Sequence, residues 1–181
     1  MDKISIRRAK NAIPGLIQLA TYIKQNKPNI VTVIEIGSYV GDSTAVWAKH
    51  FNEVIAVDPW ENGYDENDAS SWKYPMSLVE KQFDEMATTY SNIVKWKMSS
   101  FEAARKFDEN TVQFVYIDAL HTFDGVKNDI ELWYPKIMKG FYIGGHDYGS
   151  KHHPGVKMAV DTMFGKPDVT FPDSSWLKRK I

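Results

Sequence analysis

Cysteine is absent from the 181 residues of the chain. This absence excludes disulfide bonds, thiolate metal sites and a cysteine nucleophile, and it makes a cytoplasmic location the simplest expectation. The sequence also lacks any run of eighteen apolar residues, and its opening residues mix charged with apolar side chains. We therefore predict neither a membrane-spanning helix nor a secretory signal.

A charge excess of either sign is missing as well. The chain has 22 lysine and arginine residues against 23 aspartate and glutamate residues, a formal net charge of −1. Such a chain produces no field that attracts nucleic acid or an anionic membrane, so we expect neither as a partner. The length and a hydrophobic fraction of 43% are those of one globular domain, which we place over residues 1–181.

Apolar runs alternate with helical patterns along the chain. Five runs bounded by turn residues are typical of strands: residues 31–37, 53–59, 92–98, 112–119 and 140–145. Between them, apolar residues recur at helical spacing in residues 40–51, 76–86, 126–137 and 156–163. An N-terminal helical segment is predicted within residues 1–30, where Leu16, Leu19 and Ile23 share one helix face.

This alternation predicts an α/β fold with a doubly wound, mainly parallel sheet and helices on both of its faces. Near the end of the chain, two short strand-like pieces lie around residues 172–175, too close together for a helical crossover. An antiparallel C-terminal hairpin that closes the sheet edge fits this spacing, and it raises the predicted number of strands to seven.

The least regular segment, WENGYDENDASSWKYP over residues 60–75, is acidic and contains four aromatic residues. It follows the second predicted strand directly, so we predict that it forms a lid over a ligand; a solvated loop is the alternative. Exposed aromatic residues would equally suit contact with a second copy of the chain, which leaves a homodimer open.

The first predicted strand runs into a glycine-containing turn and a helix start, with the sequence VIEIGSYVGDST over residues 33–44. In doubly wound sheets, ligands bind beside this turn. A dinucleotide fingerprint requires a glycine at the position of Tyr39, and a P-loop requires a lysine at the position of Asp42. The negative charge of Asp42 would also repel a phosphate. The loop is therefore not built for a pyrophosphate, and a tight turn without any ligand is the alternative.

Two acidic residues point to another kind of ligand. Asp58 ends the second predicted strand about twenty residues further on, where an acid binds the ribose hydroxyls of an adenosine. Glu35 lies late in the first strand, and a buried carboxylate is costly unless it meets a cation or hydrogen-bond donors. An adenosine ligand that carries amino-acid and sulfonium groups satisfies these observations.

The loop motif E-x-G-x-x-x-G-x-S, formed by Glu35, Gly37, Gly41 and Ser43, resembles that of class I S-adenosylmethionine-dependent methyltransferases. The resemblance is to catechol O-methyltransferase-like and macrocin-type O-methyltransferases. It extends through the stretches AVDPW, MSSFEA, FVYIDALH and KGFYIGGHDY, and so covers roughly residues 31–149. The resemblance implies a Rossmann-like fold, S-adenosylmethionine as cofactor and transfer of a methyl group to oxygen.

The resemblance also implies roles for individual residues at the cofactor. The methionine part would be surrounded by residues of the first loop, namely Glu35, Gly37, Ser38, Gly41 and Ser43. Asp58 would hold the ribose hydroxyls, and Ser99 and Ser100 would flank the adenine. For the two serines a plainer role is open, because either can cap the helix that residues 101–107 suggest.

Asp118 closes the fourth predicted strand, and His146 with Asp147 closes the fifth, so neighbouring strands about 4.8 Å apart deliver these side chains to one crevice. By the resemblance, Asp118, His146 and Asp147 would bind a divalent metal such as Mg²⁺ or Mn²⁺, which lowers the pKa of a bound hydroxyl. An imidazole at position 146 departs from the all-oxygen sites of that family. Either the ion is not magnesium or His146 is not a ligand.

His121 follows Asp118 by three residues, at the place where catechol-type enzymes carry the lysine that takes the substrate proton. We expect His121 to act as general base together with Asp118; a metal ligand and a structural histidine are the alternatives. His152 and His153 are expected to line the substrate or to be solvated, because adjacent loop residues rarely bind one ion.

The expected function is therefore S-adenosylmethionine-dependent methylation of a hydroxyl on a small molecule, such as a sugar or phenol, with divalent metal assistance. Two alternatives stay open: a metal-independent small-molecule methyltransferase, and a non-catalytic module that binds an adenosine ligand. A nicotinamide oxidoreductase is disfavoured because the pyrophosphate turn is missing.

Overall fold

The structure, a computed structural model, describes residues 12–65 and 68–181, so the predictions made for residues 1–11 lie outside the described residues. Seven strands form one sheet in the order β3-β2-β1-β4-β5-β7-β6. The strands are β1 (Thr32–Ile36), β2 (Glu53–Asp58), β3 (Ile93–Lys97), β4 (Val112–Ile117), β5 (Ile137–Gly145), β6 (Val169–Thr170) and β7 (Trp176–Arg179).

Helices connect the strands. They are α1 (Ala12–Asn26), α2 (Asp42–His50), α3 (Met76–Ala87), α4 (Ser100–Ala104), α5 (Phe123–Trp133) and α6 (Pro154–Phe164), with 3₁₀ turns η1 (Ala69–Ser71) and η2 (Tyr134–Lys136). Each predicted helix is confirmed. The helix predicted to reach residue 137 ends at Trp133, because Pro135 cannot continue a helix, and Ile137 instead begins β5.

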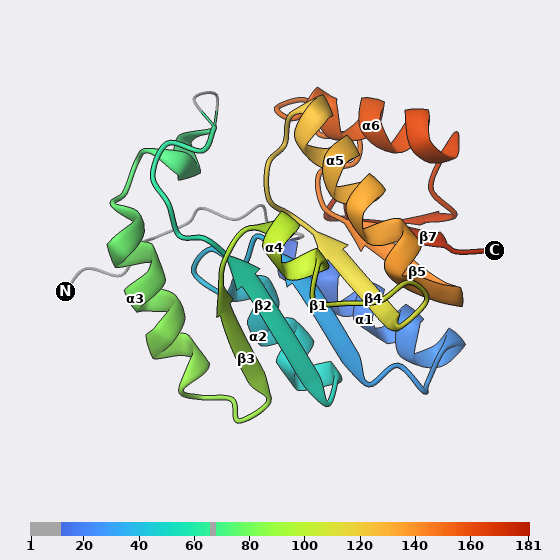
Figure 1. Ribbon diagram of the computed structural model, residues 1–181, viewed down its shortest axis with the longest axis horizontal. Coiled ribbons are helices and arrows are strands. Elements are labelled where there is room, and N and C mark those ends of the chain that lie inside the picture. The colour runs from blue at the N-terminus through green and yellow to red at the C-terminus, as the bar shows by residue number, and fades with distance from the viewer. Residues whose placement is uncertain (1–11, 66–67) are drawn as a thin grey trace.

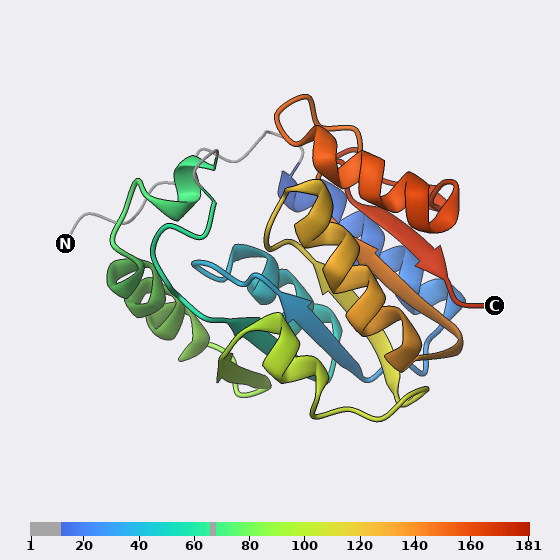
Figure 2. The ribbon, with the colours of Figure 1, turned by 45° about the horizontal axis from the view of Figure 1, so that its top comes forward.

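The sheet is covered on both faces. Helices α1 and α2 lie behind it and α4 and α5 in front in Figure 1, and α6 lies beside α5 in both views (Figures 1 and 2). Strands β1 to β5 pair in parallel, β7 pairs antiparallel with β5, and β6 pairs antiparallel with β7. The predicted doubly wound α/β fold and its C-terminal hairpin are thus confirmed. None of the described helices is both long and apolar enough to cross a membrane.

The core lies between the central strands and the helices. Trp47 of α2, Trp133 of α5 and Trp176 of β7 are fully buried, and the inner residues of β1 and β4 are buried on both faces of the sheet. Strands covered on both faces read as continuous apolar runs, which is why these two were recognisable from the sequence.

Three backbone hydrogen bonds join the carboxyl ends of the central strands. The amide of Gly37 donates to Val57 (2.9 Å), that of Asp118 to Ile36 (2.8 Å) and that of His146 to Ile117 (3.1 Å). Four chain segments therefore leave the sheet side by side at one edge. The loops that carry the predicted site residues begin at this edge.

Candidate active site

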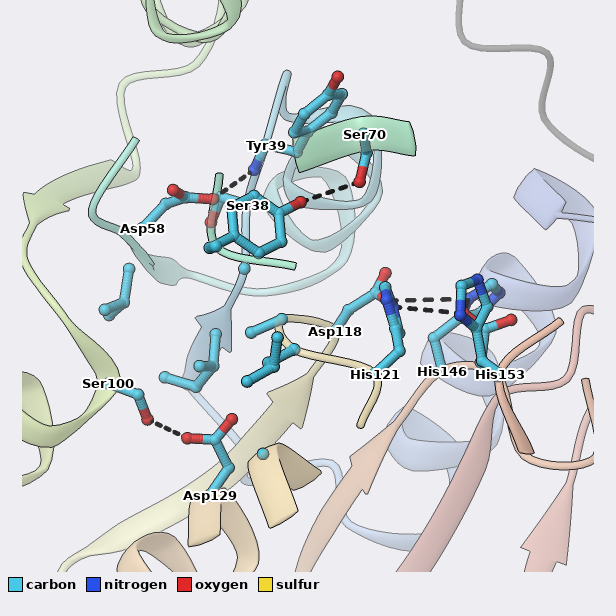
Figure 3. Close-up of a pocket in the computed structure, with 18 of the residues that line it drawn as sticks. Ser38, Tyr39, Asp58, Ser70, Ser100, Asp118, His121, Asp129, His146 and His153 are labelled. Atoms are coloured by element: carbon cyan, nitrogen blue, oxygen red, sulfur yellow. Dashed lines mark hydrogen bonds and ion pairs between the residues drawn. The ribbon is translucent and has the colours of Figure 1, made fainter. Parts of the chain in front are cut away.

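A cavity of about 1100 Å³ opens at this edge of the sheet. Its size exceeds that of most single-ligand pockets, so it has room for a cofactor and a second small molecule. Ten of the predicted site residues line it: Gly37, Ser38, Ser43, Asp58, Ser99, Ser100, Asp118, His121, His146 and Asp147. Figure 3 shows Ser100 and Asp129 at one end of the cavity and His121, His146 and His153 at the other.

Glu35, predicted to touch the cofactor, is fully buried and is not among the residues that line the cavity. Its carboxylate accepts hydrogen bonds from the hydroxyl of Thr44 and from Nε1 of Trp47, at 3.0 Å for the latter. Burial raises the pKa of Glu35, and the bond from Thr44 opposes that rise. The donors that make this burial tolerable come from the protein, so Glu35 anchors the start of α2 beneath the loop.

Gly41 also lies outside the cavity lining, and its role is conformational. It precedes α2 with a left-handed φ of 89°, and a Cβ atom there would lie 2.1 Å from the terminal methyl group of Met86. Gly37 has a φ of 87°, and its Cβ would lie 2.3 Å from the carbonyl oxygen of Asp118. At Gly37 two backbone segments pass too closely for a side chain to fit, whereas at Gly41 the flexible Met86 side chain can move and the left-handed φ is what favours glycine.

Asp58 lies at the end of β2 and lines the cavity, at the place predicted for a ribose. Its two carboxylate oxygens accept the backbone amides of Tyr39 (2.9 Å) and Trp60 (2.7 Å). Burial raises the pKa of Asp58 in spite of these bonds. The carboxylate thus fixes the first loop, including Tyr39 with its positive φ of 49°, and faces the cavity.

On the opposite side of the cavity, Ser99 is the N-cap of α4 in a capping box with Glu102, so the predicted capping role is confirmed for Ser99, whereas Ser100 is the first residue of the helix. The hydroxyl of Ser100 donates to Asp129 and accepts from Nε1 of Trp133. Burial raises the pKa of Asp129 to about 6, although the bond from Ser100 opposes that rise. Sequence reasoning missed Asp129, although its spacing places it on the buried face of its helix.

Asp118 and Asp147 lie between two imidazole rings. Nε2 of His121 is 3.3 Å from Oδ1 of Asp118 and 3.4 Å from Oδ2 of Asp147. Nδ1 of His146 is 3.7 Å and 3.3 Å from the same two oxygens. Asp147 adopts a left-handed φ of 62°, a strained conformation that is typical of functional sites. The prediction that β4 and β5 bring Asp118, His146 and Asp147 together is confirmed, and His121 joins them.

Charges in this cluster balance one another. Burial disfavours the charged form of His121, yet hydrogen bonds with Asp118 and Asp68 raise its pKa to about 10. Burial also opposes the charge on His146, but Asp118 and Asp147 raise its pKa to about 9. A divalent cation beside the two carboxylates would neutralise them and weaken this hold on the imidazole protons.

The donor set fits such a cation. Ligand atoms of Asp118, His121 and Asp147 all lie within 4.8 Å of one another. Two carboxylates and an imidazole suit Mn²⁺ or another transition ion better than Mg²⁺, which favours oxygen ligands alone. This group contains His121, whereas the predicted ligand set contained His146.

The segment of residues 60–75, apart from residues 66 and 67, contributes to the site unevenly. Tyr64 and Ser70 line the cavity, and their hydroxyl groups are 2.9 Å apart. Trp60 is 5% exposed and donates through Nε1 to the carbonyl of Tyr39 (2.9 Å), so it belongs to the core, whereas Trp72 is 63% exposed. Sequence reasoning missed Asp68, which lies 3.0 Å from Nδ1 of His121.

The chain is similar to known proteins in both sequence and structure. A family model described as a methyltransferase domain matches residues 34–148. The solved structure of the O-methyltransferase NovP is 16% identical, with a TM-score of 0.62 over 93% of this chain and 78% of that chain. CalS11, a TDP-rhamnose 3'-O-methyltransferase, is 14% identical, with a TM-score of 0.64 over 94% and 80%. No curated protein sequence matches the chain significantly.

Spermidine synthase from Thermotoga maritima shares the fold too, at 14% identity and a TM-score of 0.54 over 87% of this chain and 58% of that chain. At such identities the structural likeness shows the fold alone. One fold therefore carries enzymes with different names and products, and the reaction has to be argued from the site.

Proposed function

Since the chain belongs to the methyltransferase-domain family and is an S-adenosylmethionine-dependent methyltransferase, we propose that it methylates a hydroxyl group of a small, sugar-like molecule with the help of a divalent cation. The observation that carries this proposal is the meeting of two carboxylates and two imidazoles in the cavity that also contains Asp58.

In this proposal the cofactor lies along the first loop. Gly37, Ser38 and Ser43 border its methionine part, and Asp58 binds the ribose hydroxyls. Ser99, Ser100 and Asp129 border the adenine, with the second carboxylate oxygen of Asp129 as an acceptor for the exocyclic amino group. With this placement, the sulfonium group would face the ends of β4 and β5.

Methyl transfer is a direct displacement. The acceptor oxygen attacks the methyl carbon, the bond from that carbon to the sulfonium sulfur breaks, and the sulfur keeps the electron pair. S-adenosylhomocysteine leaves as a neutral thioether. Asp118 and Asp147, with His146 as the imidazole ligand, would hold a divalent cation, which would lower the pKa of the acceptor hydroxyl. Nε2 of His121, which also faces both carboxylates, then stays free to receive the hydroxyl proton.

The chemical character of the cavity beyond the carboxylates supports a hydroxyl-rich acceptor. Polar side chains line this part of it: Ser150, His152, His153, Asp173 and Ser174. Such groups hydrogen-bond a sugar better than they cover a flat aromatic ring. The name of CalS11, which refers to a nucleotide-linked sugar, is consistent with this choice.

A transfer assay tests the proposal. Labelled S-adenosylmethionine is incubated with a panel of nucleotide sugars and phenols, before chelation, after chelation, and after addition of Mn²⁺ or Mg²⁺. We expect label on a sugar, loss of transfer after chelation and its return with Mn²⁺. Full activity after chelation would establish the metal-independent alternative, and transfer to phenols alone would contradict the sugar assignment.

A further inference from the structure

The two imidazoles beside Asp118 and Asp147 differ at their second nitrogen. Nδ1 of His121 lies 3.0 Å from Oδ2 of Asp68. Nε2 of His146 is buried and has no hydrogen-bond partner within residues 12–65 and 68–181. Catalytic and metal-binding histidines typically donate their second N–H to a carboxylate or carbonyl. Of the two rings, His121 is the one with this arrangement.

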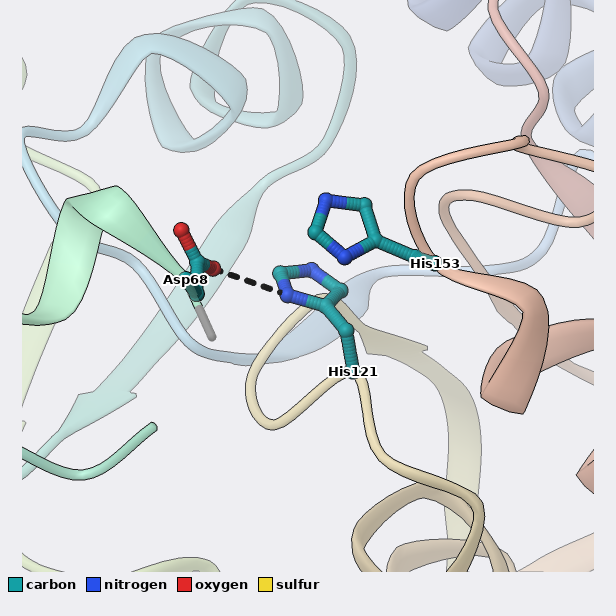
Figure 4. Close-up of side chains that lie close together, drawn as sticks. All are labelled: Asp68, His121 and His153. Atoms are coloured by element: carbon teal, nitrogen blue, oxygen red, sulfur yellow. Dashed lines mark hydrogen bonds and ion pairs between the residues drawn. The ribbon is translucent and has the colours of Figure 1, made fainter. Parts of the chain in front are cut away.

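Asp68 is itself held in place from the backbone. It is the N-cap of η1, and its Oδ1 accepts the amide of Ser70 at 2.8 Å. Its other oxygen faces His121, as Figure 4 shows. The two side chains are only 12% and 14% exposed, so the contact is shielded from water.

Such a contact fixes the orientation of the ring. With Nδ1 held by Asp68, His121 presents Nε2 toward Asp118 and Asp147. We infer that Asp68 is a positioning residue, which holds His121 in the ring orientation that makes Nε2 available to the acceptor. This inference rests on the proposed function for its catalytic consequence, and on the Asp68–His121 contact for its geometry.

His153 closes the arrangement on the opposite side. Its ring lies 4.2 Å from that of His121, centroid to centroid, at 32°. Ligand atoms of Asp68, His121 and His153 also fall within 4.8 Å of one another, which makes a second cation site the competing interpretation. The direct hydrogen bond between Asp68 and His121 accounts for their distance without an ion, and the test separates the two.

The decisive variant is Asp68→Ser. A serine still caps η1 by accepting the amide of Ser70, but it is too short to reach His121. The matched control is Glu61→Ser, which removes an exposed acid from the same segment. Equal melting temperatures of the two variants would show that the fold is intact in both.

Two measurements test the inference. The first is the ¹⁵N-resolved imidazole N–H resonance of His121, assigned by its loss in His121→Gln. We expect this resonance to be protected from water exchange in the wild type and in Glu61→Ser, and to lose its protection in Asp68→Ser. Unchanged protection in Asp68→Ser would overturn the inference, whether or not an acceptor is known.

The second measurement is steady-state kinetics with the acceptor found by the transfer assay. Removal of a partner that orients a catalytic group typically costs 10–100-fold, so we expect Asp68→Ser to lower kcat by about that factor with an unchanged KM for S-adenosylmethionine. An unchanged kcat, or an equal fall in Glu61→Ser, would contradict a positioning role.

Titration with Zn²⁺ addresses the competing cation site. A binding event that is lost in both His153→Ala and Asp68→Ser would overturn the inference in favour of an ion between these residues. If the wild type transfers no methyl group to any acceptor, the proposed function fails, while the resonance still decides whether Asp68 holds His121.

Discussion

The two halves of the site differ in the partners of their charged groups. On the side of β1 and β2, Asp58 in the cavity lining and Glu35 beneath it accept hydrogen bonds from neutral donors: a hydroxyl, an indole and two backbone amides. On the side of β4 and β5, the carboxylates of Asp118 and Asp147 face imidazoles that share their charge.

This difference separates a binding half of the site, where Asp58 and Asp129 border the proposed cofactor, from a catalytic half, where Asp118 and Asp147 face the two imidazoles. Carboxylates held by fixed neutral donors keep one geometry, which suits recognition of hydroxyl and amino groups. Carboxylates paired with groups that exchange protons can give up those partners to a cation or a substrate, which suits catalysis. We therefore expect substitutions in the two halves to affect different measurements.

The largest effect is expected from Asp118→Asn. Loss of one carboxylate from the catalytic half removes a cation ligand and a partner of His121, so we expect kcat to fall by roughly 100- to 1,000-fold, with weaker binding of Mn²⁺. Transfer kinetics and calorimetry with Mn²⁺ measure this. Asp124→Asn, which changes an exposed acid on α5, is the control. Normal kcat in Asp118→Asn would remove this residue from the chemistry.

Asp129→Asn tests how much the burial of an ionised carboxylate in the binding half lowers the free energy of unfolding. The pKa of Asp129 in the folded protein is about 6, above its ordinary value of 3.8, so the folded state retains the proton and stability falls as the pH rises between these values. The shift corresponds to about 3 kcal/mol. Urea unfolding should show the variant more stable than the wild type by up to that amount at pH 7, with no gain at pH 4; a gain independent of pH would refute the assignment.

Gly37 lies where the two halves meet, so Gly37→Ala should disturb both. The residue has a positive φ, and its Cβ would lie 2.3 Å from the carbonyl of Asp118, so we expect a loss of about 2 kcal/mol in the free energy of unfolding. Gly165→Ala is the matched control, because that glycine also has a positive φ but no atom near its Cβ. An equal loss in both variants would show that the close approach to Asp118 costs nothing.

The smallest effect is expected from Asp58→Asn. The asparagine keeps one side-chain oxygen that can accept a backbone amide of the loop, but it lacks the negative charge that faces the proposed ribose position. We expect affinity for S-adenosylhomocysteine to fall by about tenfold, as for loss of one hydrogen bond to a charged group. Binding of Mn²⁺ should not change. Calorimetry measures both affinities, with Glu61→Gln as the control. Weaker Mn²⁺ binding in Asp58→Asn would contradict the division into a binding half and a catalytic half.

Much of this architecture was predictable because it depends on periodicity. Apolar runs located the parallel strands, and loops at the carboxyl ends of such strands meet, so the sequence alone predicted that Asp58, Asp118 and Asp147 share one cavity. The contacts of side chains between distant segments were not predictable. Asp68 reaches His121 across 53 positions, from an irregular segment whose pattern gives no direction for a side chain.

Glu35 illustrates a different limit. The sequence allowed either a cationic ligand or protein donors as partners, and the structure provides Thr44 and Trp47, which are three residues apart on the helix face that covers β1. Similarly, spacing placed His121 and His146 at the same crevice, but only the surroundings of their second nitrogens distinguish them.

The most direct test of the central claim is calorimetric titration of S-adenosylhomocysteine into the wild type and into Asp118→Asn. The division between a binding half and a catalytic half predicts one site per chain, with the same affinity in both proteins although the variant has lost its transfer activity. No binding to the wild type would contradict the cofactor assignment, and a fall in affinity in Asp118→Asn as large as that in Asp58→Asn would contradict the division.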